Sequence, residues 1–136
     1  MATGTAGSAA RDVMMPVKQT LAYTLNFDTT GASSGVAIGT IPAGSVLVKP
    51  ISGVSVSVAF NGNSTNTLDI GPSTDSGTNL WMTVGALGSI AFVPLDEAVT
   101  NVVSVDTIVQ AYVVSTASAS AGSAEVVIAY IPDNDG

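Results

Sequence analysis

Short runs of β-branched residues, separated by turn-forming residues, extend along almost the whole chain. The 136 residues include 19 valines, 8 isoleucines and 15 threonines, against only 7 leucines. Such side chains are stiff at χ1 and fit a pleated surface better than a helix. Ten runs predict strands near residues 17–27, 35–41, 45–49, 51–60, 66–71, 79–84, 87–93, 101–105, 107–115 and 124–131. We therefore expect an all-β fold, a sandwich or barrel of about eight to ten strands.

The chain length fits one domain, which we place at residues 17–136 behind a flexible N-terminal arm at residues 1–16. The start lacks the basic and apolar regions of a secretory signal, which predicts synthesis in a cytoplasm. The end of the arm is apolar and could contact a neighbouring molecule; the alternative is a frayed terminus whose methionines pack on their own domain. The candidate contact residues there are Val13, Met14, Met15, Pro16 and Val17.

The composition is rich in apolar residues and poor in charge. Hydrophobic residues make up 46% and charged residues 10%, with a net charge of −7. This acidity disfavours binding to nucleic acid and to anionic membrane surfaces. The absence of cysteine and histidine excludes disulfides, Cys/His zinc sites, thiol nucleophiles and Ser-His-Asp triads. We expect no enzyme, no cofactor and a surface that is partly covered by a partner.

The clearest strand is the alternating stretch Ile51–Phe60, which ends at Asn61-Gly62. This dipeptide favours a tight reversal, because both residues tolerate positive φ. The pattern predicts that Thr67–Gly71 returns antiparallel beside it as a hairpin.

The last two predicted strands are apolar on both faces, which indicates burial on both sides. One face can meet the core, and the other can meet either a partner or loops of the same chain. The candidate partner contacts are Ile108, Tyr112 and Val114 in the first strand, and Val126, Ile128 and Tyr130 in the second. The single tryptophan, Trp81, could anchor an interface or lie in the core, and the core is the favoured interpretation.

Few residues suggest a chemical site. Asp96 and Glu97 are adjacent and would point to opposite faces of an extended chain, so we interpret them as a solvated turn. The carboxylates of Asp69–Gly77 and Asp133–Gly136 could hold a hard cation, but neither segment has a complete calcium-loop pattern, and turn chemistry explains both better. A Ser-Lys dyad through Lys18 or Lys49 has no motif to support it. We predict no metal site and no catalytic residue.

Three segments carry a resemblance to a known family. They are Gly39–Val46 (GTIPAGSV), Val54–Gly62 (VSVSVAFNG) and Thr67–Gly71 (TLDIG), followed by Asp75. This succession resembles the capsid cement, or head decoration, proteins of tailed bacteriophages and related head-fibre base domains. The resemblance covers about a quarter of the chain, and its motifs are turns and strands.

The resemblance implies a jelly-roll-like β-sandwich that forms dimers or trimers on the outer capsid surface and joins major capsid protein subunits without catalysis. Such a protein would be made in the host cytoplasm and would reinforce the head against internal DNA pressure. The alternative is a virion-displayed module that recognises a host glycan or receptor through loops at residues 28–35, 61–66 and 115–123.

Overall fold

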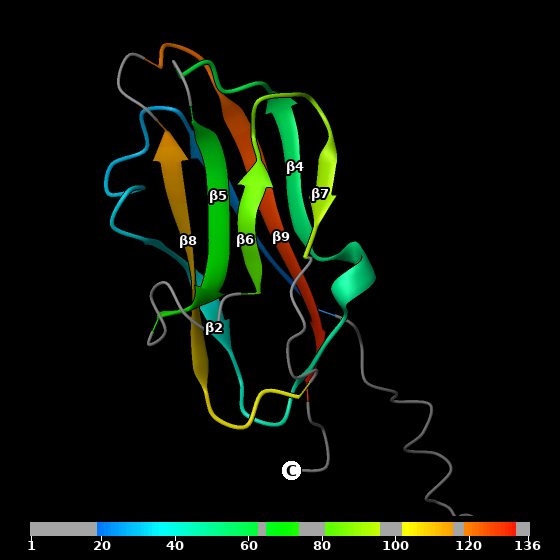
Figure 1. Cartoon of the computed structure of the whole chain (residues 1–136). Helices are drawn as coiled ribbons and strands as arrows, with labels where there is room; N and C mark the ends of the chain where they lie inside the picture. Colours follow the sequence, from blue (N-terminus) through cyan, green and yellow to red (C-terminus); the bar gives the residue numbers. More distant parts are fainter. Residues whose placement is uncertain (1–18, 63–64, 74–80, 96–101, 116–118, 133–136) are drawn as a thin grey trace, which may run out of the picture.

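Two antiparallel β-sheets packed face to face form the protein (Figure 1). The computed structural model describes residues 19–62, 65–73, 81–95, 102–115 and 119–132. The larger sheet has the order β1 (Gln19–Asn26), β9 (Ser123–Ile131), β4 (Gly53–Val58) and β7 (Phe92–Pro94), and the short β3 (Val46–Leu47) also pairs with β9. The smaller sheet has the order β2 (Val36–Ile41), β8 (Thr107–Ser115), β5 (Asn66–Pro72) and β6 (Met82–Ala86).

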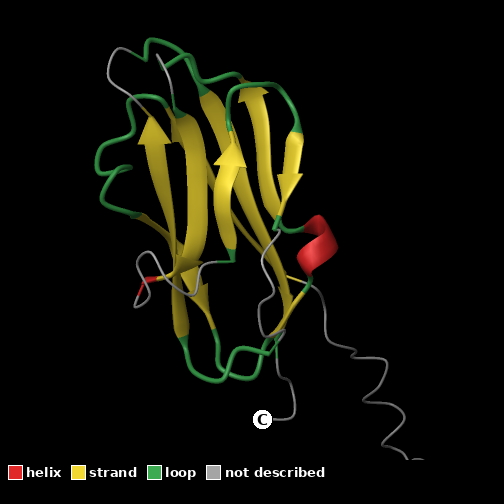
Figure 2. Ribbon diagram, in the orientation of Figure 1, coloured by secondary structure: helices red, strands yellow, loops and turns green. Residues whose placement is uncertain are grey.

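The chain passes repeatedly from one sheet to the other. β1 and β2, β4 and β5, β6 and β7, and β8 and β9 are consecutive strands that belong to opposite sheets. The strands form both layers and most of the connections lie at their ends (Figure 2). This strand order is a jelly roll, in which paired strands are mostly distant in sequence. The structure therefore confirms the predicted all-β sandwich.

The predicted hairpin between the Ile51–Phe60 and Thr67–Gly71 segments is wrong. β4 pairs with β9 and β7 in the larger sheet, whereas β5 pairs with β8 and β6 in the smaller one. The Asn61 carboxamide instead accepts hydrogen bonds from the backbone N–H groups of Ser120, at 2.8 Å, and Ala121, at 3.0 Å. The Asn61-Gly62 dipeptide indicates only that the chain reverses locally. Which strands pair is decided by residues that are far apart in the sequence.

The other strand predictions differ from the structure mainly at their ends. Ile51 belongs to η1 (Lys49–Ile51), a 3-10 turn, rather than to the following strand. In the 101–105 segment, the described residues contain only an isolated bridge, between Val46 and Val102. Most of the predicted 87–93 strand is irregular, and only its end belongs to β7.

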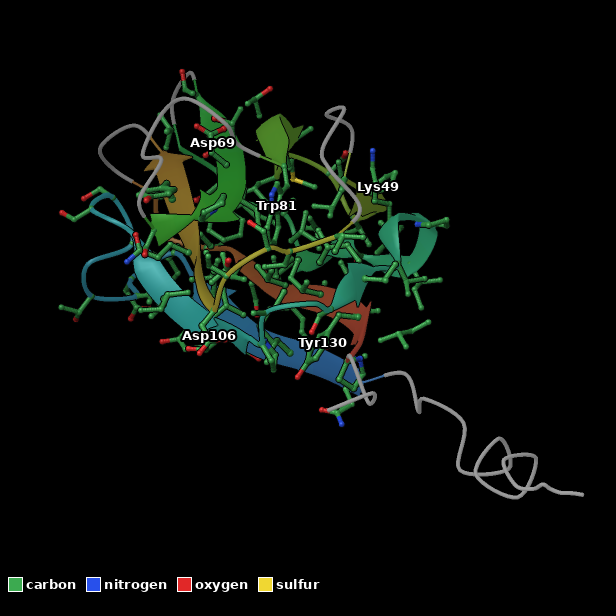
Figure 3. The ribbon with its side chains drawn as sticks, turned by 90° about the horizontal axis from the view of Figure 1, so that it is seen from below. Lys49, Asp69, Trp81, Asp106 and Tyr130 are labelled. Carbon is green, nitrogen blue, oxygen red and sulfur yellow. The ribbon has the colours of Figure 1, made fainter. Side chains whose placement is uncertain are left out.

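The core lies between the sheets and follows the alternation of the strands. Val54 and Val56 of β4 share one buried cluster with Leu68 and Ile70 of β5. Side chains fill the space between the layers in the view along the strands (Figure 3). The inward-facing residues of the two central strands complete this core, and they are Val109, Ala111 and Val113 of β8 with Ala124, Val126, Ile128 and Tyr130 of β9.

A buried serine joins the two strands that share one edge of β9. β3 and β4 both pair with that edge, and η1 interrupts the chain between them. The Ser52 hydroxyl donates to the Val48 carbonyl at 2.7 Å and accepts from the Ala129 N–H at 2.9 Å. The side chain thus satisfies backbone groups that the interrupted ladder leaves unpaired.

We predict opposite outcomes for the two fully buried serines. Ser52→Ala should lower the free energy of unfolding by about 1–3 kcal/mol, because the buried Ala129 N–H loses its acceptor. Ser45→Ala should change it by less than about 0.5 kcal/mol or raise it slightly, since the Ser45 hydroxyl has no partner among the described residues. Urea unfolding of both variants measures the difference, and equal losses would contradict the role of Ser52.

Candidate functional site

The outer side of β8 presents apolar side chains to solvent at the centre of the smaller sheet. Residues that point inward from β8 are buried, whereas Ile108 is 46% exposed and Val114 is 48% exposed. Tyr112 lies between them on the same side and is half-buried. We call Ile108, Tyr112 and Val114 the β8 face. The structure brings these three predicted contact residues together on one accessible surface.

The ring of Tyr112 is held along the sheet by its neighbours. Its hydroxyl donates a hydrogen bond of 2.7 Å to the Gln110 side-chain oxygen. The ring packs on Gly35, where a Cβ atom would lie 2.6 Å from Tyr112 Cε1. Gly35 also has a φ of 106°, a backbone conformation that side chains rarely adopt. Both constraints require glycine at this position, so Tyr112 forms a fixed part of the β8 face.

The residues beside the β8 face are small and mostly uncharged. Thr40 of β2 lies opposite Ile108, and Thr67 of β5 lies opposite Val114. Asp69 of β5 is opposite Tyr112 and projects from the outside of the sheet (Figure 3). The surface is therefore a strip of apolar and hydroxyl side chains that also carries the Gln110 carboxamide and, beside it, the Asp69 carboxylate.

Four other predicted contact residues are buried in the core. Val126 and Ile128 are fully buried, Tyr130 is 6% exposed and its hydroxyl donates to the Gln19 side chain at 3.1 Å. These side chains of β9 face the opposite sheet and are not available to a partner. Trp81 is also buried, which agrees with the core interpretation and not with an interface anchor. The predicted contact segment Val13–Val17 lies outside the described residues.

The sequence did not reveal a second exposed apolar group. Val46 of β3 lies between Ile131 of β9 and Val102, because it pairs with both. Val46 and Val102 are exposed, and Val105 in the same segment is exposed as well. This juxtaposition joins three distant parts of the chain, so no local pattern could have indicated it. Phe92, the first residue of the edge strand β7, and Ile90 just before this strand are two further exposed apolar residues.

The candidate metal and catalytic residues of the sequence lie partly outside the described residues. The described residues contain no group of three or more Asp, Glu, His or Cys side chains that could hold a metal ion. Asp69 is described, but Asp75, Asp96, Glu97 and the Asp133–Gly136 segment lie outside the described part. Lys49 begins η1, and Lys18 is outside the described part. In the same part of the chain, no helix is both long and apolar enough to cross a membrane.

Comparison with known proteins identifies a structural neighbour. Neither the protein-family profiles nor the curated protein sequences contain a match. Among solved structures, the chain is similar to a chain of the capsid asymmetric unit of cyanophage Pam1, with a TM-score of 0.59 and 20% sequence identity. The alignment covers 85% of each chain. The similarity shows that the fold of this protein also occurs in a viral capsid.

The close fit between Gly35 and Tyr112 gives a test of the β8 face. Gly35→Ala should lower the free energy of unfolding by about 2–3 kcal/mol, because the added Cβ meets the ring and the backbone is strained. Gly31 is the matched control, since it has a φ of 80° with no atom within 4 Å of its added Cβ, and its change to Ala should cost about 1 kcal/mol.

A second variant isolates the ring contact. In a Tyr112→Ala background, Gly35→Ala should lower the free energy of unfolding by less than it does in the wild-type protein, because the ring that the added Cβ would meet is gone. An unchanged loss of unfolding free energy in thermal or urea unfolding would show that the contact with the ring is not what requires glycine here.

Proposed function

We propose that this protein is a non-enzymatic structural component of a phage virion. It binds the outer surface of the capsid, joins major capsid protein subunits and stabilises the head against internal DNA pressure. The observation that carries the proposal is the fold match to a chain of a viral capsid over 85% of both chains. Equal coverage means that the two chains are similar in length and that the shared fold extends over most of both.

The motifs behind the family resemblance occupy the scaffold of the sandwich. Gly39–Val46 connects the end of β2 to β3, Val54–Gly62 includes most of β4, and Thr67–Gly71 lies in β5. These segments build turns and strands rather than a pocket, so the resemblance supports a shared architecture. It agrees with a protein whose role depends on surfaces and not on reactive groups.

The β8 face supports binding to a large protein partner. An exposed apolar strip on the outside of a sheet suits an extended contact better than a small ligand, which needs a concave site. The net charge of −7 keeps such a protein off packaged DNA. Many copies on a fixed lattice would reinforce the head through weak contacts that act together.

Heads that lack the protein provide the direct test. Purified protein should bind such heads, and the decorated heads should open at a higher temperature or resist a greater osmotic shock. Sedimentation of the heads measures binding, and release of DNA measures opening. Absence of binding, or binding without added resistance, would refute the cementing role.

Removal of apolar groups from the β8 face should weaken this binding. The double variant Ile108→Thr and Val114→Thr keeps β-branched residues, so the strand should remain stable. We expect roughly tenfold weaker binding to heads, because about 1–2 kcal/mol of apolar burial is lost. Val58→Thr is the matched control, since Val58 is similarly exposed (46%) but belongs to the other sheet. Equal effects in both variants would exclude the β8 face as the contact.

One observation favours a second candidate, a virion-displayed module that binds a host glycan or receptor. The described parts of the three candidate loops meet at one end of the sandwich. Phe27, the residue just before the first loop, donates a backbone hydrogen bond to Gly122 at 3.0 Å, and Asn61 donates one to Ala121 at 3.3 Å. Binding in a glycan array or to host cells, abolished by changes in these loops, would support this role over cementing.

A further inference from the structure

Strand β1 forms a long, regular edge of the larger sheet. Among the described strands it pairs only with β9, through eight consecutive residue pairs without a bulge. Alternate residues of such a strand direct their N–H and C=O groups away from the neighbouring strand. The outer edge of β1 therefore carries a row of backbone donors and acceptors that can pair with another strand.

The other sheet edges have features that hinder such pairing. β2 has a register shift between Ala37 and Gly39, and the pairing of β6 with β5 is irregular. β7 is only three residues long and ends in Pro94. Bulges, short strands and prolines are the devices that keep edges from pairing with other chains. β1 has none of them.

The side chains of β1 fit a second copy of the same chain. Two copies of a protein with a net charge of −7 repel each other wherever carboxylates meet. β1 has the sequence QTLAYTLN, which contains no charged residue over its whole length. Its outward-facing residues Thr20, Ala22 and Thr24 are small and exposed, so they leave the edge open.

The inner side of β1 also leaves apolar surface uncovered. Leu21 and Tyr23 point toward the core but are only partly buried. Leu21 packs against β2, where a Cβ atom on Gly39 would lie 2.8 Å from Leu21 Cδ2. β1 and β2 lie together along one margin of the molecule (Figure 3). A further strand beside β1 would cover more of both side chains.

We propose that β1 is a homodimerisation edge, along which a second copy adds its own β1 in antiparallel orientation about a two-fold axis. In the proposed register Ala22 lies opposite itself on the axis, which keeps the outer residues of both strands on one side of the joined sheet. Thr20 then faces the partner's Thr24, and Leu21 faces the partner's Tyr23. Threonine pairs and aromatic–aliphatic pairs are favourable across antiparallel strands. The two larger sheets join into one continuous sheet.

Introducing a charge of either sign at Ala22 tests both the β1 edge and the register of the proposed pairing. Sedimentation of the full chain should show a dimer that dissociates on dilution. Ala22→Lys and Ala22→Glu should each raise the dissociation constant at least about tenfold, because like charges meet on the axis. An equimolar mixture of the two variants should regain the wild-type dimer, since opposite charges then meet.

Thr40→Lys and Thr40→Glu are the matched controls, because Thr40 is exposed on the edge strand β2 and lies outside the proposed contact. A monomeric or trimeric wild-type protein, or Ala22 variants that dimerise normally, would overturn the proposal. A mixture that stays monomeric would do the same.

A disulfide provides an independent readout that does not depend on charge. The chain contains no cysteine, so Ala22→Cys adds a single thiol at the proposed axis. Directly opposite residues of antiparallel strands lie within disulfide range. Mild oxidation should link most of the Ala22→Cys protein as a dimer, whereas Thr40→Cys should stay largely unlinked. Equal linkage of the two variants would overturn the register.

The capsid proposal is tested separately, because self-association is measured without heads. Failure of the protein to bind heads would refute cementing and leave the β1 pairing intact.

Discussion

The larger sheet depends on the pairing of β9 along both of its edges. One edge pairs with all of β1, and the other pairs with β3 and β4 in turn. The inward-facing residues of β9 supply fully buried side chains to the core, including Val126 and Ile128. Because β9 is the last of the described strands in chain order, the larger sheet cannot form until this strand has joined the earlier ones. The contacts that hold it are almost all distant in sequence, which is typical of jelly rolls.

Among the described residues, Ser45 and Ser52 are the fully buried polar side chains, and the Ser52 hydroxyl serves the backbone. Ser52 replaces missing ladder contacts where η1 separates β3 from β4, and its hydroxyl reaches β9 directly. A buried polar group is tolerated when it is hydrogen-bonded, and Ser52 meets this requirement. Because the Ser52 hydroxyl accepts from the Ala129 N–H, β9 stays hydrogen-bonded and continuous at the point where η1 separates β3 from β4.

The two sheets leave different surfaces for partners. The smaller sheet exposes the β8 face, a strip of apolar side chains fixed by the packing of Tyr112 on Gly35. The larger sheet exposes a backbone edge at β1, where recognition would come from backbone hydrogen bonds together with cross-strand side-chain pairs. A protein with both surfaces could pair with its own copy through β1 and contact a different partner through β8. This division agrees with a subunit that works in an assembly.

The amino-acid pattern determined the all-β class, the approximate position of most strands and the inward face of the clearest ones, such as Val54 and Val56 in β4. These properties follow from side-chain alternation, which is local in the chain. The pattern could not show that β4 and β5 belong to opposite sheets, because backbone pairing depends on residues far away. It also could not tell which apolar face of β9 lies in the core, since both faces look alike in the sequence. Only the tertiary structure decided that Val126, Ile128 and Tyr130 are buried while Ile108 and Val114 are exposed, because burial depends on what the opposite sheet covers.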